Sequence, residues 1–415
     1  NPVADADCIE PFVRSFGRRA FRRALDDEEV DALLALAATT ASPGPRDGIT
    51  AVISAMLQSP QFLYRVEPGA DSDFGPALAS RLSYLIAASA PDEELLHAAE
   101  QGELSSESGL LAQADRLLAT PQATEAFSHF MTQWWGLDQL DGLEKDLNLY
   151  RAWSAALPAA FAAETQHFIE AAWNDKPSLA TFLTAPYTFA DPTLADFYGY
   201  ARAASTGFAR VTPPAGRASG LLTQGAFLAT NAKANQSSPV QRGKFIRERL
   251  FCTPPAPPPA DVVVRPPVVD PRLSTRERFA AHVAEPRCAG CHALMDPIGF
   301  TFEHYDATGH YRDTDAGKAV DASGELSATD VDRKLDGVPT LAAALLESQQ
   351  VQSCVATQWF RYAFGRQESA SDGDSCTLSA LGSALAANQG DLRAAIRATV
   401  SSSMLREQRR EEPSP

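Results

Sequence analysis

The chain has 415 residues, of which 45% are hydrophobic, and its formal net charge is −16. This length allows about two to four domains, and the apolar fraction is ordinary for a globular protein with a sizeable core. The strong acidity argues against nucleic acid and anionic membrane surfaces as partners, and the longest apolar runs, such as residues 33–38, are far too short to form a transmembrane segment.

The N-terminal half of the sequence predicts a succession of helices. Residues 11–24 form a helical pattern with a basic face, whose arginines we expect to pair with acidic side chains or to face solvent. Asp26 to Glu29 match a capping box that opens the next helix. A stretch rich in Gly, Asp and Ser at 68–76 predicts a linker, after which a second helical block runs to about residue 199.

Within this second block, residues 129–135 carry aromatic and apolar side chains that include Trp134 and Trp135. Such a stripe most often belongs to the core of a helical domain. A platform that binds a ligand is the alternative, and the sequence alone leaves both open.

The C-terminal half combines helices with irregular segments. A helix is predicted from Pro239, and a strap follows at 254–271, because prolines at that density favour extended polyproline geometry. Ser274 to Glu277 form a second capping box, residues 313–331 suit short strands, and residues 338–406 are helical again. The predicted fold class is mainly α with little β. We expect an N-terminal helical module at 1–68, a central helical module at 77–210, a module at 211–335 that holds the strap and the motif described next, and a C-terminal helical module at 336–415.

The most informative motif is the pentapeptide at 288–292, which reads Cys-Ala-Gly-Cys-His. C-x-x-C-H is the attachment motif of a c-type haem. Two thiols at this spacing reach the two vinyl groups of one porphyrin as thioethers, and the adjacent imidazole meets the iron as the proximal ligand. We therefore predict one covalent haem c held by Cys288, Cys291 and His292, with redox chemistry at its iron.

Other interpretations of this motif stay open. A zinc site would combine the three residues with one of His282, His304 or His310. Two adjacent ligands, Cys291 and His292, suit one tetrahedral ion poorly. A disulfide between the two cysteines, or a pair of buried thiols, is a further alternative.

The sixth iron ligand is harder to predict. His310 is the best candidate as the distal ligand, because Gly309 and the loop around it could fold over the porphyrin. The other candidates are His282, His304, Met131 and Met404, whereas Met295 lies close to His292 on the proximal side. A side-chain ligand favours electron transfer, and an open position would bind peroxide or dioxygen.

Four further cysteines, at positions 8, 252, 354 and 376, leave an even number for disulfides. Cys354 and Cys376 flank a turn-rich stretch between two helical patterns, so we predict that they pair with each other. Cys8 would then pair with Cys252; four buried free thiols are the alternative. Disulfides and haem attachment both favour an oxidising compartment outside the cytoplasm.

An acidic segment follows the haem motif. Residues 313–317 continue to Asp321 and Glu325, and their oxygen ligands alternate around a glycine as in a calcium loop. The glycine and the final glutamate are out of register with an EF-hand. Calcium is therefore a minor alternative to a solvated acidic turn.

The residues from Cys288 to Phe300, followed by Glu303, Asp306, Gly309 and Arg312, resemble the signature of a bacterial secreted family. It is the domain-of-unknown-function 1592 family with its companion modules 1595, 1588 and 1585, which is cytochrome c-associated and common in planctomycetes and myxobacteria. Further similar segments are 16–29, 57–65, 81–85, 135–138, 236–244 and 351–366, together with Cys376. The resemblance implies one multi-module helical protein, secreted or lipid-anchored, but no established activity and no distal iron ligand.

We therefore expect a periplasmic, outer-membrane-associated or extracellular c-type haem protein that performs electron transfer or redox catalysis. Its redox partner would be another protein, for example a second cytochrome. Because residue 1 is Asn, we expect a mature or trimmed chain whose leader, which could carry a lipid anchor, is missing. The alternatives are a haem peroxidase- or oxygenase-like enzyme with an open iron site, and a non-haem secreted binding or structural protein.

Overall fold

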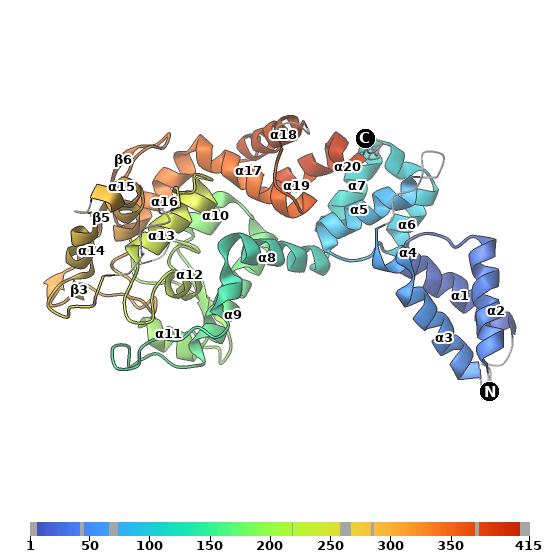
Figure 1. Cartoon of the computed structure of the whole chain (residues 1–415), viewed down its shortest axis with the longest axis horizontal. Helices are drawn as coiled ribbons and strands as arrows, with labels where there is room; N and C mark the ends of the chain where they lie inside the picture. Colours follow the sequence, from blue (N-terminus) through green and yellow to red (C-terminus); the bar gives the residue numbers. More distant parts are fainter. Residues whose placement is uncertain are drawn as a thin grey trace. The chain divides into compact units, whose positions relative to one another are not determined.

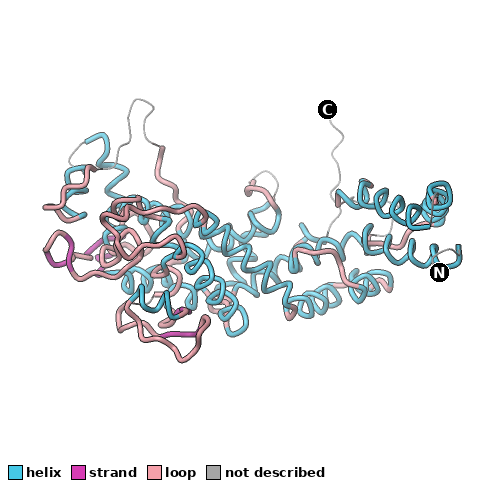
Figure 2. The backbone as a smooth tube through the Cα atoms, turned by 90° about the horizontal axis from the view of Figure 1, so that it is seen from below, coloured by secondary structure: helices cyan, strands magenta, loops and turns pink. Residues whose placement is uncertain are grey.

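The structure is a computed structural model that describes residues 6–41, 45–65, 74–217, 219–257, 267–283, 286–369 and 373–406. The described part is mainly helical with short two-stranded antiparallel sheets (Figure 2), which confirms the predicted fold class. The packing divides the chain into two compact units. We call Asn1–Ala126 with Ile396–Pro415 the terminal unit, and Phe127–Ala395 the central unit.

The borders between these units fall inside two helices, α8 (Pro121–Trp135) and α19 (Leu392–Ser401). The packing therefore does not follow the borders of the four predicted modules, which stay a prediction about the sequence. In the ranges that the structure describes, no helix combines the length and the apolar character that a bilayer crossing requires.

In the terminal unit, the helices within residues 6–58 pack around a small apolar core that includes Val13, Val30, Val52 and Met56. The predicted capping box forms, because Glu29 N donates to Asp26 Oδ1 at 2.8 Å and Asp26 N donates to Glu29 Oε2 at 3.1 Å. Besides the start of α8 and the end of α19, the elements of the terminal unit are α1 (Ala6–Phe21), α2 (Asp27–Thr40), α3 (Pro45–Gln58), α4 (Pro60–Leu63), α5 (Gly75–Ala87), α6 (Glu93–Glu100), η1 (Glu103–Ser105), α7 (Glu107–Leu118) and α20 (Ser403–Arg406).

The arginines of α1 and of the residues directly after it form hydrogen bonds inside this unit. Arg18 donates to Glu93 at 3.0 Å, and Arg23 donates to Glu29 at 2.7 Å. Arg22 is buried and donates to the backbone carbonyls of residues 61, 62 and 64, which ties the end of α1 to α4. The ion pairs of Arg18 and Arg23 confirm the prediction that arginines of this segment pair with acidic side chains, whereas Arg22 binds backbone carbonyls instead.

The central unit holds most of α8 and the remaining elements, three pairs of which are antiparallel strands: β1 with β2, β3 with β4, and β5 with β6. The short strands predicted within 313–331 are β3, β4 and β5. The elements of this unit are η2 (Leu137–Leu140), α9 (Leu157–Asp175), α10 (Leu179–Thr184), β1 (Thr188–Ala190), α11 (Pro192–Tyr198), β2 (Ala209–Val211), α12 (Gly225–Thr230), α13 (Pro239–Phe245), the π-helical turn η3 (Ile246–Leu250), α14 (Thr275–Val283), α15 (Pro286–Phe300), β3 (Thr314–Asp315), β4 (Lys318–Ala319), β5 (Ser323–Leu326), β6 (Arg333–Asp336), α16 (Gly337–Glu347), α17 (Gln349–Phe364) and α18 (Asp374–Ala387).

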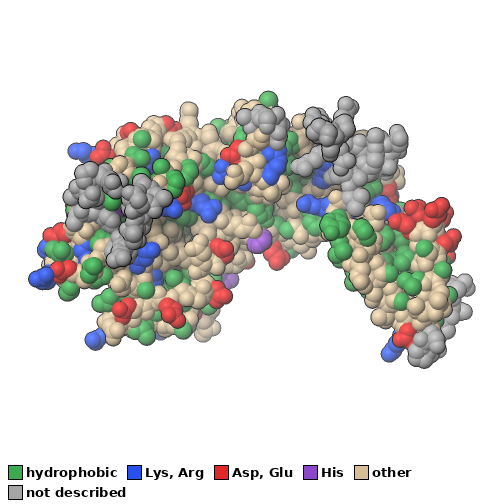
Figure 3. Space-filling model, viewed as in Figure 1, with side chains coloured by type: hydrophobic (Ala, Val, Ile, Leu, Met, Phe, Trp, Pro, Cys, Tyr) green, Lys and Arg blue, Asp and Glu red, His purple; other side chains and the backbone are tan. Residues whose placement is uncertain are grey.

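Aromatic side chains form the core of this unit. The rings of Phe127 and Trp173 lie 4.6 Å apart, and Trp135 packs against Phe245 at 5.4 Å. Trp134 and Trp135 are 3% and 1% exposed, which confirms that their stripe belongs to the core. On the outside, Figure 3 shows acidic and basic side chains interspersed with one another.

One disulfide joins distant parts of the central unit, and it corrects the predicted pairing. Cys252, just after η3, is bonded to Cys354 in α17, with the Cα atoms 5.4 Å apart. Cys376 is a free, exposed thiol in α18, so the predicted pairs Cys354–Cys376 and Cys8–Cys252 are both wrong. The reason is orientation, because Cys354 is buried on the inner face of α17 while Cys376 points to solvent. The side chain of Cys8 lies outside the described residues.

Helix α15, which carries the haem motif, is held between α13 and β5 (Figure 1). A Cβ at Gly243 of α13 would lie 1.9 Å from the carbonyl oxygen of Met295, and one at Gly299 of α15 would lie 1.9 Å from that of Pro239. A Cβ at Gly324 of β5 would lie 2.2 Å from the carbonyl oxygen of Pro297. Only glycine permits these backbone approaches, so the three close contacts fix the position of the C-terminal half of α15 in the central unit.

Candidate functional site

The three residues of the predicted haem site lie on one face of α15. Cys288, Cys291 and His292 occupy helix positions i, i+3 and i+4, which are neighbours on a helical surface. Both cysteines are unpaired, half-buried thiols, so the structure does not form the disulfide considered as an alternative. The preceding helix α14 begins with the predicted capping box, in which Ser274 N donates to Glu277 Oε2 at 2.8 Å and Glu277 N donates to Ser274 Oγ at 3.3 Å.

The proline-rich strap starts beside this face. The Sγ atom of Cys291 lies 3.9 Å from the carbonyl oxygen of Ala256. Ala256 belongs to the segment that follows the disulfide-bonded Cys252 in the chain. Where the described chain resumes, Gln236 Nε2 donates to the carbonyl of Pro267 at 2.9 Å. Both described ends of the strap therefore contact the central unit, and residues 258–266 lie outside the described residues.

The imidazole of His292 is oriented by a buried carboxylate one turn further along the helix. Its Nδ1 lies 3.0 and 3.1 Å from the two carboxylate oxygens of Asp296, whose side chain is 1% exposed. This hydrogen bond raises the pKa of His292 above its ordinary value, against the opposing effect of burial. In the neutral ring the proton is then on Nδ1 and the lone pair on Nε2, which is the arrangement that metal-binding histidines have.

The histidines proposed as further ligands have other roles in the structure. His310 is exposed, and its ring packs edge-on against Phe197 of α11 at 5.8 Å. His304 Nδ1 donates to the carbonyl of Arg312 at 3.0 Å, and its ring stacks on Tyr311. Among the described residues, no three His, Cys, Asp or Glu side chains are placed to hold one metal ion, so the geometry adds no support for zinc. The distal contact of His310 with iron stays a prediction.

Of the remaining candidates for a sixth ligand, two are buried in the central unit. Met131 is fully buried in α8, and Met295 is buried where α15 packs against α13. Met404 belongs to α20 of the terminal unit, and the side chain of His282 lies outside the described residues.

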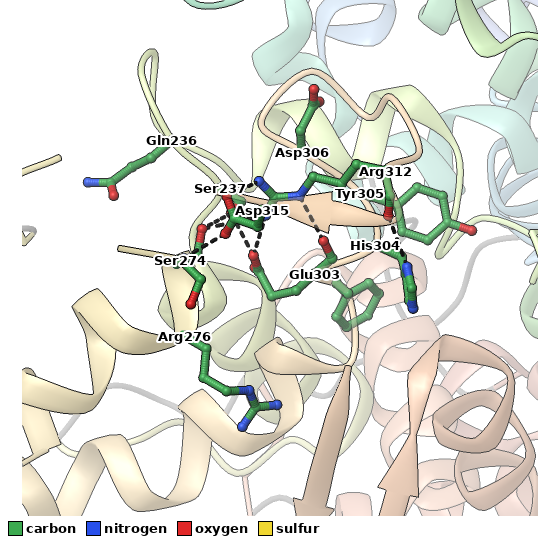
Figure 4. A network of polar contacts seen from close by, with 12 residues as sticks. Gln236, Ser237, Ser274, Arg276, Glu303, His304, Tyr305, Asp306, Arg312 and Asp315 are labelled. Atoms are coloured by element: carbon green, nitrogen blue, oxygen red, sulfur yellow. Dashed lines mark hydrogen bonds and ion pairs between the residues drawn. The ribbon is translucent and has the colours of Figure 1, made fainter. Parts of the chain in front are cut away.

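The signature residues that follow α15 form a polar network (Figure 4). Buried Glu303 accepts from Arg312 Nη2 at 2.6 Å and from Ser237 Oγ at 3.0 Å. Arg312 Nη1 lies 2.9 Å from Asp315 Oδ1, and the other oxygen of this carboxylate accepts from the backbone N of Thr275 at 2.6 Å. The network therefore joins the start of α14 to the loop after α15 and to β3, and it positions the helix pair that carries the motif.

Arg242 of α13 is a second anchor of the same loop. It is completely buried and donates to the carbonyls of Leu228, Phe302, Tyr305 and Asp306, at 2.7 to 3.2 Å. Burial lowers the pKa of Arg242 to about 10, which leaves the guanidinium charged at neutral pH. The carbonyl dipoles of this loop thus surround a buried cation.

The acidic segment considered as a calcium loop contacts protein groups instead. Asp315 pairs with Arg312 as described above, and Asp321 accepts from Ser323 N at 2.9 Å. Residue 317 is a glycine with φ of +76° at the turn between β3 and β4, a conformation that glycine adopts without strain. The geometry agrees with an acidic turn, and calcium stays an untested alternative.

A buried carboxylate in α9 was not singled out by its sequence context. Glu164 is 1% exposed, and its two oxygens accept from Thr188 Oγ1 and from the hydroxyl of Tyr198, both at 2.6 Å. Burial raises the pKa of Glu164 to about 7 in spite of these hydrogen bonds. The backbone N of Gly225 donates to the same Tyr198 oxygen at 2.8 Å, so the group ties α9 to α11 and α12.

Sequence reasoning also missed the role of Asp296, although it lies within the motif segment. The signal that could have found it is its spacing, since a carboxylate four residues after a histidine in a helix lies on the same face. For Arg242 there was no such local signal, because its partners are backbone carbonyls 14 to 64 residues away.

Four family models match the chain in order. Protein of unknown function (DUF1595) covers residues 8–67, and Protein of unknown function (DUF1592) covers 75–200. Protein of unknown function (DUF1588), labelled PSCyt3, covers 218–315 and includes the whole of α15, and Protein of unknown function (DUF1585) covers 332–405. The label of the third model associates that region with cytochromes. Neither a curated protein nor a solved structure matches the chain.

Proposed function

We propose that this chain, which belongs to the DUF1592 family with its companion modules, is an extracytoplasmic c-type haem protein. The proposal is supported by the cytochrome-associated label of the module that contains α15. Cys288 and Cys291 would each form a thioether to one porphyrin, and His292 would bind its iron. Bound there, the haem supplies a one-electron iron couple. The role that we propose is electron transfer or redox catalysis with another protein, such as a cytochrome, as partner.

The observation that carries this proposal is the state of the motif residues. The two thiols are unpaired and share a helix face with the imidazole, so one planar group laid along this face could meet all three side chains. A half-buried position suits a thioether, because the sulfur stays accessible to the incoming vinyl group while the rest of the helix is fixed by its packing.

Asp296 is the residue that orients the imidazole of His292 at the proposed haem site. Its buried carboxylate accepts the Nδ1 proton of His292 and holds the ring in one orientation. If iron were bound by His292, a carboxylate in this position would make the imidazole a stronger donor toward it and would favour the oxidised metal, because it stabilises positive charge nearby.

The compartment is supported by the disulfide. The bond between Cys252 and Cys354 closes a long loop in the same unit as the motif. Disulfides of this kind persist in oxidising surroundings outside the cytoplasm, where c-type haem is also attached. We therefore propose that the protein functions in the periplasm, on the outer membrane or outside the cell.

The proposal is tested by absorption spectroscopy of the full chain produced together with a haem-attachment machinery. Wild type should show a Soret band and a reduced-minus-oxidised difference spectrum, and His292→Ala should lose both. His304→Ala is the matched control, because that imidazole donates to a backbone carbonyl and should leave the spectrum unchanged.

The same spectra separate the two redox roles. A low-spin ferric iron that ignores cyanide supports electron transfer, whereas a high-spin iron that shifts on adding cyanide or peroxide supports a peroxidase- or oxygenase-like enzyme. A wild-type protein without any Soret band refutes both.

A further inference from the structure

We propose that the central unit contains a second site, a small polar cavity that binds a carboxylic acid carrying a hydroxyl or amino group. The cavity has a volume of about 170 Å³ and lies between the end of α8, the end of α12, α13 and η3. For comparison, a cavity of roughly 150 Å³ accepts benzene. The site does not depend on the haem proposal, because none of its lining residues belongs to the C-x-x-C-H motif.

The first observation is a buried donor without an acceptor. Trp135 lines the cavity and is 1% exposed, yet its indole Nε1 has no hydrogen-bond partner among the described residues. The adjacent Trp134 provides the contrast, since its Nε1 donates to the carbonyl of Arg249 at 2.9 Å. A buried indole N–H that lacks a partner is costly, so it points to an acceptor that a bound molecule would supply.

The second observation is a buried acceptor without a donor on the same lining. The side-chain oxygen Oε1 of Gln241 is buried, and no described group donates a hydrogen bond to it. A ligand that satisfies both atoms must offer an acceptor to Trp135 and a donor to Gln241. A purely apolar molecule, or an anion that has no hydrogen-bond donor, such as chloride or sulfate, does not meet this requirement, whereas a carboxylate with a hydroxyl or ammonium group does.

The third observation is the charge on the lining. Lys244 and Glu248 form an ion pair at 3.3 Å and largely neutralise each other. Within the described residues, the guanidinium of Arg249 has no carboxylate partner, and it lines the same cavity. The lining therefore carries one positive charge that no described carboxylate pairs with, in the planar form that binds carboxylates in a bidentate manner.

The backbone explains why these side chains meet. The turn η3 is π-helical, and it follows α13 directly. A π-turn widens the spacing along a helix, so Lys244, Glu248 and Arg249 can all reach one cavity, and such turns are frequent at functional sites.

The experiment is isothermal titration calorimetry of the full chain with four probes: lactate, malate, serine and glutamate. We expect at least one of them to bind, and its amide counterpart, such as lactamide for lactate, to bind at least about tenfold more weakly because it lacks the charge that Arg249 recognises.

Three substitutions test the assignment of the site. Arg249→Gln, Gln241→Leu and Trp135→Phe should each weaken the binding of that probe about tenfold or more, since each removes one polar contact. Trp153→Phe is the matched control, because Trp153 is also buried but does not line the cavity, and its binding should equal that of wild type.

Two results overturn the proposal. The first is no binding of any of the four acids to wild type, which means that the cavity holds water alone. The second is binding that Arg249→Gln and Gln241→Leu leave unchanged while both variants keep the wild-type circular dichroism spectrum, which means that the acid binds elsewhere. Neither outcome depends on whether haem is attached, so this proposal and the haem proposal can fail independently of each other.

Discussion

The disulfide between Cys252 and Cys354 should account for a large share of the stability of the central unit. It closes a loop across a sequence separation of 102 residues. In the chain-entropy model a loop of this length restricts the unfolded chain by about 4.7 kcal/mol, and removing native disulfides typically costs about 2 to 5 kcal/mol. The double variant Cys252→Ala with Cys354→Ala should therefore lose a free energy of unfolding within that range.

The assay is urea unfolding followed by tryptophan fluorescence. All five tryptophans of the chain lie between residues 134 and 359, so the signal reports the central unit alone. The denaturant slope should stay close to that of wild type, while the midpoint falls. Reduction of the wild-type protein should reproduce the shift.

The matched control is Cys376→Ala. Sequence spacing predicts that Cys376 pairs with Cys354, but the structure leaves it as an exposed free thiol, so this substitution should change the midpoint by little. If Cys376→Ala lowered the midpoint as much as the double variant does, the pairing in the structure would be wrong.

Three further predictions follow from the site. Gly243→Ala should destabilise the central unit by about 1 to 3 kcal/mol in the same urea assay, because its Cβ would overlap the backbone of α15, whereas Gly290→Ala, with open space around it, should not. Burial raises the pKa of Glu164 from its ordinary 4.5 to about 7, so the folded protein holds this proton more tightly than the unfolded chain. The free energy of unfolding should therefore fall by up to about 3 kcal/mol as the pH rises from 4.5 to 7, and Glu164→Gln should abolish that decline. An identical pH profile in both proteins would refute the role of this carboxylate. Asp296→Asn should raise the reduction potential of the haem by roughly 60 mV or more, the one-electron equivalent of a tenfold change, as measured by redox titration; an unchanged potential would mean that this carboxylate does not act on His292.

The parts of the fold that sequence predicted are those set by local physics. The capping boxes at Asp26 and Ser274 depend on residues three positions apart, and both form as expected. The burial of Trp134 and Trp135 follows from helical periodicity in the same way. The i, i+3, i+4 spacing of the haem motif likewise fixes a shared helix face once the segment is helical.

The parts that sequence could not predict depend on contacts between distant segments. Cysteine spacing says nothing about which helix face a thiol occupies, so spacing alone pairs Cys354 with the nearby Cys376 and not with Cys252. The carbonyl cage of Arg242 and the close crossing at Gly243 exist only after α12, α13 and α15 have packed. The lining of the acid-binding cavity, assembled from helices far apart in the chain, is of the same kind.

The measurement that tests the central claim most directly is the intact mass of the denatured full chain, produced together with a haem-attachment machinery. The account predicts a mass increased by one haem, localised by peptide mapping to the segment that contains Cys288 and Cys291, and absent from the Cys288→Ala, Cys291→Ala double variant. An unmodified mass, or a peptide in which these two thiols are joined to each other, would contradict it.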